Sequence, residues 1–247
     1  MSMPQKVIVA YIDEPPFVSP GDGDWPVGFD AALAARVLEI MGVADPRSRL
    51  VTFAQLLDGV AADQWSFNTP LFISEERKKL VRFSRPVWGL SDGLMVRKPD
   101  GGRFRTYEQL ARDGTARLGV VEGQVQFDTA RGAGIPQERI DRFRSPEETV
   151  EALRSGAIAA YASVAMAHRG FLAKRPDPNL DYSNLMVPEF AGHAGSAPAL
   201  GAFSFALGIN PFADAFDRAL ADFLGSPEHK ALAARFGFGI ANGIAAG

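Results

Sequence analysis

The apolar positions in the first third of the chain follow two spacings. Residues 7–11 form a continuous apolar run that stops at the turn sequence of residues 13–16, which predicts a short buried strand. After a loop rich in glycine and proline, apolar residues recur at helical intervals over residues 33–41, with Asp30 as the expected cap and Gly42 as the expected end. A strand, a helix and a strand are predicted next, at residues 49–53, 54–62 and 66–73. This order is typical of a parallel α/β sheet.

The middle third repeats the alternation of strands and helices. Gly123 is the expected start of one helix. Ser145 is the expected cap of another, because Glu148 follows it three residues later. Strands are predicted at residues 117–121, 140–143, 159–163 and 185–190, and helices at residues 146–155 and from the end of the third strand to about Leu172.

The last fifth of the chain has a different pattern. Residues 201–209 predict a strand, and residues 211–238 predict two amphipathic helices. The first helix carries an apolar stripe that we interpret as core packing, made of Phe212, Phe216, Leu220 and Phe223. The small residues 240–247 are expected to fray. Two α/β patterns followed by a segment that matches neither well indicate two lobes.

Composition excludes several classes of function. The chain has 247 residues, of which 47% are hydrophobic and 22% charged, and this is ordinary globular composition. Its net charge of −3 argues against nucleic acid or an anionic membrane surface as the main partner. Because cysteine is absent, thiol catalysis, disulfides and cysteine-ligated metals are excluded.

Motifs of catalysis and of cofactor binding are missing. The three histidines are scattered without metal-ligand spacing, and we expect surface or helix-side roles for them. No nucleophile elbow, Walker loop or dinucleotide fingerprint occurs. The adjacent carboxylates Asp13 and Glu14 point in opposite directions on an extended chain. The sequence therefore predicts no catalytic residue, no metal site and no cofactor.

The N-terminus passes from a few polar residues directly into a strand pattern. It lacks a charged segment followed by a long apolar run, so no signal peptide is expected in this sequence. Two readings stay open, a mature exported protein whose signal peptide has been removed, and a cytosolic protein.

Arg77 lies just beyond a predicted buried strand. Ser74 is the expected N-cap of a helix whose first turn carries Glu75 and Glu76. The free backbone N–H groups of that turn and the guanidinium of Arg77 could together bind an anion. Alternatively, Arg77 pairs with Glu75 or Asp63 on the surface. Spacing alone does not decide between these interpretations.

A short strand followed by four motifs, in order, resembles the pattern of the type II solute-binding proteins of polar amino-acid ABC transporters. The resemblance spans essentially the whole chain, and each motif is weak alone but specific as part of the set. The motifs are Pro15-Pro16-Phe17, Gly28-Phe29-Asp30, Ile73-Ser74-Glu75-Glu76-Arg77 and Phe83-Ser84-Arg85-Pro86-Val87-Trp88. The second half adds support through Gly119-Val120-Val121-Glu122-Gly123 and the closing pattern Gly225-Ser226-Pro227 with Arg235-Phe236-Gly237.

The resemblance implies an α/β fold of two lobes, each with a mixed sheet flanked by helices, joined by two hinge strands. Residues 1–91 plus 204–247 would form lobe one, and residues 92–203 lobe two. The family implies a monomeric periplasmic protein that traps a small carboxylate-bearing ligand by hinge closure and delivers it to ABC transporter membrane subunits. Arg77, with Ser74, would bind the ligand's α-carboxylate. Phe17 and Trp88 would be cleft walls or core residues.

Departures from the family pattern bear on the ligand. Phe72 stands where family members place a small polar residue, and Asn68 precedes it in the same strand; both are candidate ligand contacts. In the second lobe Gln124 follows Gly123 where family members have threonine. Ser163 occupies the position of the aspartate that, in family members, receives the ligand's ammonium. We therefore expect a carboxylate-bearing ligand that lacks a free α-ammonium or meets another anion, such as Glu14. Aromatic residues near the cleft would suit an apolar, aromatic or cationic body.

Two other functions stay open at this point. One is an enzyme on the same scaffold, since some relatives resemble cyclic-acid dehydratases, and Glu14, Glu122 and His193 would be its available acid–base groups. The other is a ligand-sensing module severed from a kinase or channel.

Overall fold

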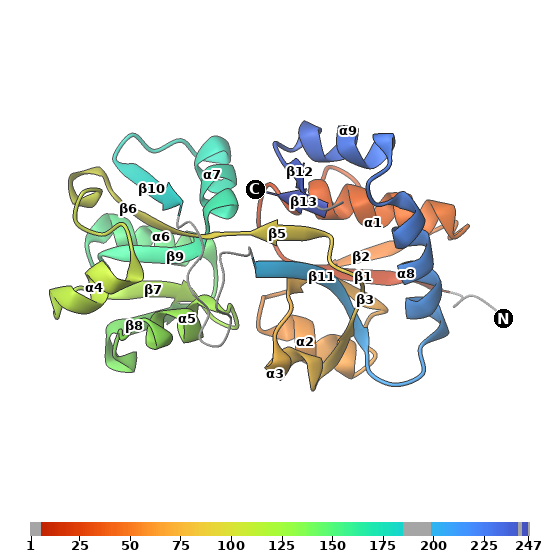
Figure 1. Ribbon diagram of the computed structural model, residues 1–247, viewed down its shortest axis with the longest axis horizontal. Coiled ribbons are helices and arrows are strands. Elements are labelled where there is room, and N and C mark those ends of the chain that lie inside the picture. The colour runs from red at the N-terminus through yellow and green to blue at the C-terminus, as the bar shows by residue number, and fades with distance from the viewer. Residues whose placement is uncertain (1–5, 185–198, 242–243, 247) are drawn as a thin grey trace. The chain divides into compact units, whose positions relative to one another are not determined.

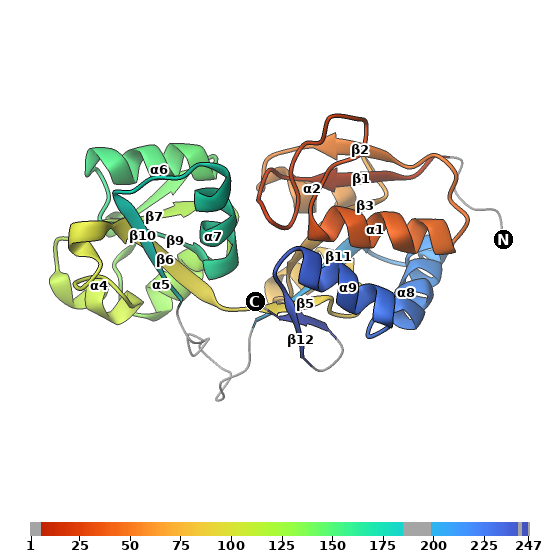
Figure 2. The same ribbon diagram turned by 90° about the horizontal axis from the view of Figure 1, so that it is seen from above.

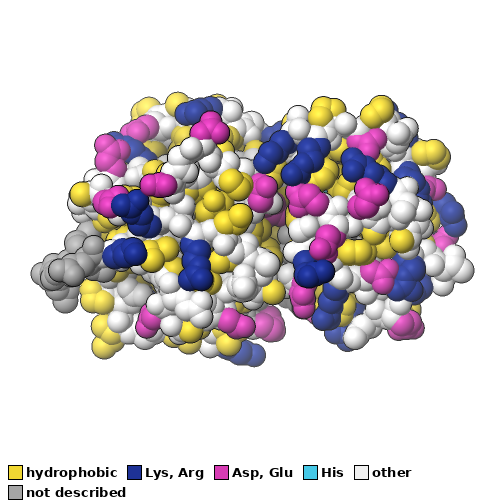
Figure 3. Space-filling view, turned by 180° about the vertical axis from the view of Figure 1, so that it is seen from behind, with side chains coloured by type: hydrophobic (Ala, Val, Ile, Leu, Met, Phe, Trp, Pro, Cys, Tyr) yellow, Lys and Arg dark blue, Asp and Glu magenta, His cyan; other side chains and the backbone are white. Residues whose placement is uncertain are grey.

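A computed structural model describes residues 6–184, 199–241 and 244–246. The chain divides into two compact units, Met1–Gly89 with Ala199–Gly247 and Leu90–Pro198, and each unit has its own sheet (Figures 1 and 2). In the described ranges no helix is both long and apolar enough to cross a membrane. On the face shown in Figure 3, basic side chains lie beside acidic ones, without a field of one sign.

The sheet of the first unit is mixed. Its main strand order is β12-β13-β5-β11-β3-β1-β2, and β4 pairs with β11. β1 pairs in parallel with β2 and β3, whereas β11 runs antiparallel to β3. The strands are β1 Ile8–Tyr11, β2 Arg47–Leu50, β3 Phe67–Phe72, β4 Val81–Phe83, β5 Trp88–Leu90, β11 Ala199–Ala206, β12 Gly239–Ala241 and β13 Ile244–Ala246; the helices are α1 Phe29–Ile40, α2 Gln55–Ala61, α3 Glu75–Lys78, α8 Pro211–Phe223 and α9 Pro227–Arg235.

The start of α1 differs from the prediction. Gly28 is the N-cap, and Asp30 lies inside the first turn, so the expected cap at Asp30 is wrong. Gly28 has φ 121°, and a Cβ there would lie 2.4 Å from the carbonyl oxygen of Phe17. Only glycine meets both conditions without strain. The helix ends at Ile40, and Gly42 follows with φ 75°, as expected for a glycine after a helix.

Aromatic rings fill the core between the sheet and α8. The ring of Phe67 in β3 lies 5.1 Å from that of Phe216, and the ring of Phe203 in β11 lies 5.0 Å from it. Phe212, Leu220 and the other members of the predicted apolar stripe are buried, so the interpretation of this stripe as core packing is confirmed. Rings at such separations add to the stabilisation from burial alone.

Among the described C-terminal residues, 239–241 and 244–246 form strands, so the expectation that this segment frays is wrong for them. β12 and β13 pair antiparallel with each other, and β13 runs parallel to β5. The backbone N–H of Ala245 donates to the carbonyl oxygen of Val87 at 3.0 Å, and the Ala245 side chain is fully buried. Small residues are therefore used here for close strand packing.

The second unit has a five-stranded mixed sheet in the order β10-β6-β9-β7-β8. Ser145 caps α6, as predicted, and its Oγ accepts a hydrogen bond from the N–H of Glu148 at 3.3 Å. α5 begins at Gln126 and not at Gly123, which adopts φ 87° in the preceding turn. The predicted strand at residues 185–190 lies outside the described residues. The elements are β6 Asp92–Arg97, β7 Leu118–Val121, β8 Ile140–Phe143, β9 Ala160–Val164, β10 Leu180–Asn184, α4 Tyr107–Asp113, α5 Gln126–Gly132, α6 Pro146–Ser155 and α7 Ala165–Lys174.

Candidate functional site

The turn from β3 into α3 brings the predicted anion-binding residues together. Ser74 has extended backbone angles and caps α3, and its Oγ accepts a hydrogen bond from the N–H of Arg77 at 3.2 Å. The expected N-cap is thus confirmed. Because α3 spans only four residues, its dipole is small, and the guanidinium of Arg77 is the buried positive charge at this turn.

Arg77 is buried, with 6% of its surface exposed. Its Nη1 donates to the carbonyl oxygen of Phe72 at 2.7 Å, and its guanidinium carbon lies 5.5 Å from the ring centroid of Phe53. This placement is not the exposed one that a simple surface ion pair would have. A buried guanidinium presents several N–H donors in a fixed plane and can bind a carboxylate through two of them.

Phe53 is a neighbour of Arg77 that the sequence analysis did not single out. It is half-buried and lies between β2 and α2. Its approach to Arg77 depends on the pairing of strands far apart in sequence, and no local motif marks it.

Phe17, Phe72 and Trp88 form one ring cluster in the first unit. The Trp88 ring lies 5.2 Å from that of Phe72, nearly perpendicular to it, and 5.8 Å from that of Phe17. Each of these residues is at most 9% exposed. Trp88 also covers Gly201, where a Cβ would lie 2.1 Å from the indole. The cluster therefore has a packing role whether or not a solute touches it.

A buried carboxyl group adjoins this ring cluster. Asp30 is 2% exposed, and its Oδ1 accepts a hydrogen bond from Trp88 Nε1 at 3.2 Å. Burial raises the pKa of Asp30 well above its usual value; the Trp88 hydrogen bond opposes this shift, and the charge of Glu14 adds to it. Glu14, half-buried in a bridge with Val18, thus lies near a second acid that the sequence analysis named only as a cap.

Asn68 is part of the core. Its side chain is fully buried in β3 and accepts a hydrogen bond from Trp65 Nε1 at 2.5 Å. Its Nδ2 donates to the carbonyl oxygen of Leu56 and to Ser204 Oγ, both at 2.9 Å. These bonds join β3 to α2 and β11, so the contacts of Asn68 are those of a structural residue.

The remaining predicted residues, Gln124 and Ser163, belong to the second unit. Gln124 is 7% exposed and lies in the turn between β7 and α5. Ser163 is 1% exposed inside β9, opposite Gly93 of β6. The other seven, Glu14, Phe17, Asn68, Phe72, Ser74, Arg77 and Trp88, lie in the first unit.

A second buried acid, Asp92, lies at the start of β6. Its Oδ2 accepts a hydrogen bond from Tyr107 Oη at 2.8 Å, and its Oδ1 accepts one from Gln126 Nε2 at 2.7 Å. Burial raises the pKa of Asp92 to about 6, against the lowering effect of these two hydrogen bonds. No sequence motif marks this network, because Tyr107 and Gln126 lie 15 and 34 residues from Asp92.

Two histidines lie on helices, where the sequence analysis expected surface or helix-side roles, and both are buried. His168 in α7 donates from Nε2 to the carbonyl oxygen of Gly93 at 3.1 Å, and burial lowers its pKa to about 4. His229 in α9 accepts the N–H of Gly225 at Nδ1 at 3.0 Å, and burial lowers its pKa. His193 lies outside the described residues. In the described part of the chain, no group of three or more His, Asp or Glu side chains could hold a metal ion.

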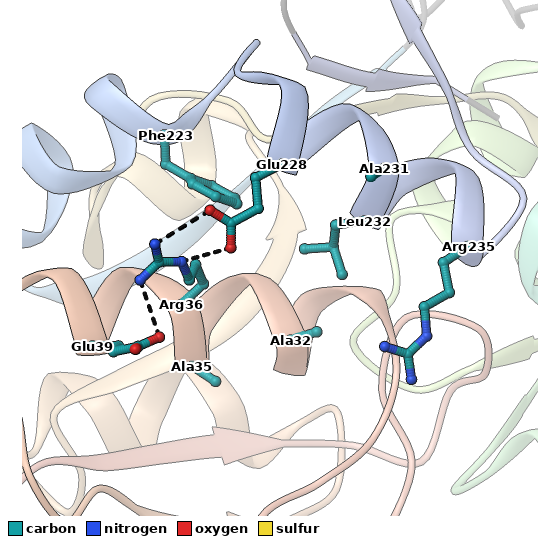
Figure 4. Close-up of a pocket in the computed structure, with 9 residues that line it drawn as sticks. All are labelled: Ala32, Ala35, Arg36, Glu39, Phe223, Glu228, Ala231, Leu232 and Arg235. Atoms are coloured by element: carbon teal, nitrogen blue, oxygen red, sulfur yellow. Dashed lines mark hydrogen bonds and ion pairs between the residues drawn. The ribbon is translucent and has the colours of Figure 1, made fainter.

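A shallow groove of about 500 Å³ runs between α1, α9 and the end of α8 (Figure 4). Arg36 closes one end, donating to Glu228 at 2.7 and 3.2 Å and to Glu39 at 3.0 Å. Arg235 lies at the other end. The other lining residues are Ala32, Ala35, Phe223, Ala231 and Leu232. None of the nine predicted residues lines this groove.

Comparison with known proteins gives matches over most of the chain. Residues 7–239 match the model of the bacterial extracellular solute-binding proteins, family 3. A curated relative from Sinorhizobium fredii, named "Probable amino-acid ABC transporter periplasmic-binding protein y4tE", is 28% identical over 214 residues, which are 85% of this chain and 70% of the relative.

Solved structures agree on the fold. EhuB in complex with hydroxyectoine superposes with a TM-score of 0.82 at 23% identity, covering 94% of this chain and 88% of EhuB. An ancestral arginine-binding protein bound to arginine gives 0.80 at 19% identity, covering 96% of this chain and 100% of that protein. These likenesses show the fold of the type II periplasmic binding proteins, as the sequence motifs predicted.

Proposed function

This chain belongs to the bacterial extracellular solute-binding proteins, family 3, and from that premise we propose that Arg77 binds the carboxylate of the solute it carries. The chain is a solute-binding component of an ABC importer. The proposal concerns which atoms hold the solute and what kind of solute it is.

The observation that carries the proposal is the burial of the Arg77 guanidinium at the end of β3. One of its nitrogens donates to the Phe72 carbonyl oxygen at 2.7 Å, which fixes the plane of the group. A guanidinium held in one plane loses little entropy when it binds a carboxylate through two parallel N–H bonds. Burial also strengthens this ion pair, because nearby solvent screens it less.

The proposed solute class is argued from the charged and aromatic side chains among the nine candidate residues and from Asp30. Ser163 offers no negative charge, whereas Glu14 and Asp30 lie close to each other in the first unit. Phe72 stands where family members have a small polar side chain. These features favour a carboxylate-bearing solute with an apolar or delocalised cationic body over an ordinary α-amino acid. Hydroxyectoine, bound by the structural relative EhuB, combines a carboxylate with a delocalised amidinium.

The solute would be captured by hinge closure. The solute would bind first to the unit that carries Arg77, and contacts from the second unit, around Gln124, would then favour the closed state. The chain passes between the units at Gly89 and Leu90, so residues 89–92 would form one hinge. Both units would then face the membrane subunits of the importer, outside the cytoplasm, with the protein acting as a monomer and without turnover of the solute.

Calorimetric titration tests the proposal. Hydroxyectoine, L-arginine, L-glutamine and aromatic acids would be titrated into wild type, Arg77→Met and Arg85→Ala. Arg85 is a matched control, because it pairs with Asp217 on the surface of the same unit. We expect binding to be lost in Arg77→Met and kept in Arg85→Ala, with unchanged circular dichroism spectra.

Retention of wild-type affinity by a folded Arg77→Met protein would remove Arg77 from the site. Thermal shift gives a second readout. A solute at 100 times its dissociation constant should stabilise wild type by about 2.7 kcal/mol. Arg77→Met should show no such shift with the same solute.

A further inference from the structure

Asp92 joins three elements of the second unit, β6, α4 and α5, through side-chain hydrogen bonds. It is the first residue of β6, two residues after the chain enters the unit at Leu90. Its two oxygens accept from Tyr107, the first residue of α4, and from Gln126, the first residue of α5. One carboxylate therefore holds the first turns of two helices against the strand that enters the unit.

The carboxyl group of Asp92 is buried without a positively charged partner among the described residues. Asp92 is 2% exposed, and neither donor carries a positive charge. Within the described residues no cation pairs with it. Leaving a carboxylate ionised in the interior costs free energy, and two neutral hydrogen bonds offset only part of that cost. A leucine could fill the same space, but it would leave both donors without an acceptor. The carboxylate thus suits the task of fixing two donors at once.

The helix turn held by Asp92 adjoins the candidate contact in this unit. Gln126 lies two residues after Gln124, and the intervening backbone leads directly from the turn at Gly123 into α5. On its other side, Asp92 pairs with Val164, so Ser163 lies one step along the neighbouring strand. A shift of the first turn of α5 would move Gln124, and Asp92 prevents that shift relative to the entering strand.

We propose that Asp92 is a positioning residue: through Gln126 it fixes the first turn of α5 to the strand entering the unit, and so holds Gln124 for solute contact. This inference rests on the proposed function. It assigns a mechanical role to a residue that does not touch the solute. When a solute binds at Gln124, the Gln126–Asp92 hydrogen bond would couple any displacement of the first turn of α5 to residues 90–92.

The test compares two variants that each remove one donor from the same carboxylate. Gln126→Met removes the bond to α5, and Tyr107→Phe removes the bond to α4, which carries no candidate contact. Both should lower the melting temperature. We expect Gln126→Met to weaken hydroxyectoine or L-arginine binding about tenfold, and Tyr107→Phe to change it little. Equal weakening by the two variants would overturn the inference, because it would indicate general destabilisation.

A rescue variant tests whether the hydrogen bond itself, and not the location of the charge on residue 92, holds Gln124 in place. Asp92→Asn/Gln126→Glu exchanges the amide and the carboxylate and can keep both hydrogen bonds, so the affinity lost in Gln126→Met should return. Failure to recover in a folded double variant would count against a positioning role.

Hydrogen exchange decides the matter without a solute. Amides of residues 126–132 should exchange faster in Gln126→Met than in Tyr107→Phe, with the reverse for residues 107–113. Unchanged exchange in α5 would overturn the inference even if no probe binds. Wild type that binds none of the probes, with the predicted exchange pattern intact, would instead count against the proposed solutes.

Discussion

Trp88 Nε1 donates to Asp30 Oδ1 at 3.2 Å, so the last strand before the chain leaves the first unit is fastened to the first turn of α1. The acceptor is a buried carboxyl whose pKa burial raises well above its usual value. A raised pKa means that ionised Asp30 is less favourable in the folded state than in the unfolded chain.

Asp30→Asn should therefore stabilise the protein at neutral pH. The amide oxygen still accepts from Trp88, and the cost of a buried negative charge disappears. The contribution of Asp30 to stability is fully present below its unfolded pKa and is lost as pH rises through the raised folded value. Thermal melts at pH 4 and pH 8 should show a gain for the variant that is larger at pH 8. A lower melting temperature at pH 8 would contradict this account.

The pKa of Asp92 gives a pH dependence with a defined window. The folded value of about 6 lies above the usual 3.8, so protonation favours the folded state between these values. The free energy of unfolding of wild type, relative to Asp92→Asn, should fall by up to about 3 kcal/mol as pH rises from 4 to 7. Urea titrations of both proteins at intervals of pH measure this difference. A constant difference across the range would refute the raised pKa.

The contribution of His168 to the free energy of unfolding should change with pH in the opposite direction to that of Asp92. Burial lowers its pKa from 6.5 to about 4, so the unfolded chain binds more protons in this range. Its contribution is present above pH 6.5 and is lost as pH falls toward 4. Relative to His168→Gln, wild type should lose up to about 3 kcal/mol over that fall. Because Asp92 and His168 oppose each other, wild type alone should show a flatter profile than either variant, and urea titrations of the three proteins would reveal this.

Gly201 is a point where a single methyl group should be costly. A Cβ there would lie 2.1 Å from the Trp88 indole, and the ring is already packed against Phe72. Gly201→Ala should lower stability by about 1–3 kcal/mol, as overpacked cores do. Gly23→Ala is the control, because no atom lies within 4 Å of its added Cβ. Equal melting temperatures for the two variants would show that Trp88 moves aside easily.

Periodicity predicted most of the elements correctly because they depend on local sequence. α6 is an example, since Ser145, Glu148 and the following apolar spacing lie within one stretch of chain. The cap of α1 was assigned wrongly to Asp30, because the need for glycine at residue 28 comes from the approach of Phe17, eleven residues earlier. The final strands were also missed, because small residues give no periodic signal and β13 is defined by its pairing with β5.

The candidate site was predictable only in part. Arg77 was found from the cap at Ser74 and from the resemblance, both of which are properties of a short motif. Asp30 and Asp92 were not found as buried acids, since burial depends on which strands and helices meet. Asn68 shows the reverse case: its motif suggested a ligand contact, whereas its hydrogen bonds join distant parts of the core. The roles of the nine residues in binding stay predictions.

The pairing of β13 with β5 has a consequence for biosynthesis. A ribosome makes β5 and then all of the second unit before it reaches β11, α8 and β13. The second unit can fold while the chain is still growing, but the first sheet stays open until its late strands emerge. The order of synthesis thus allows the second unit to fold before the unit that carries Arg77 can complete its sheet.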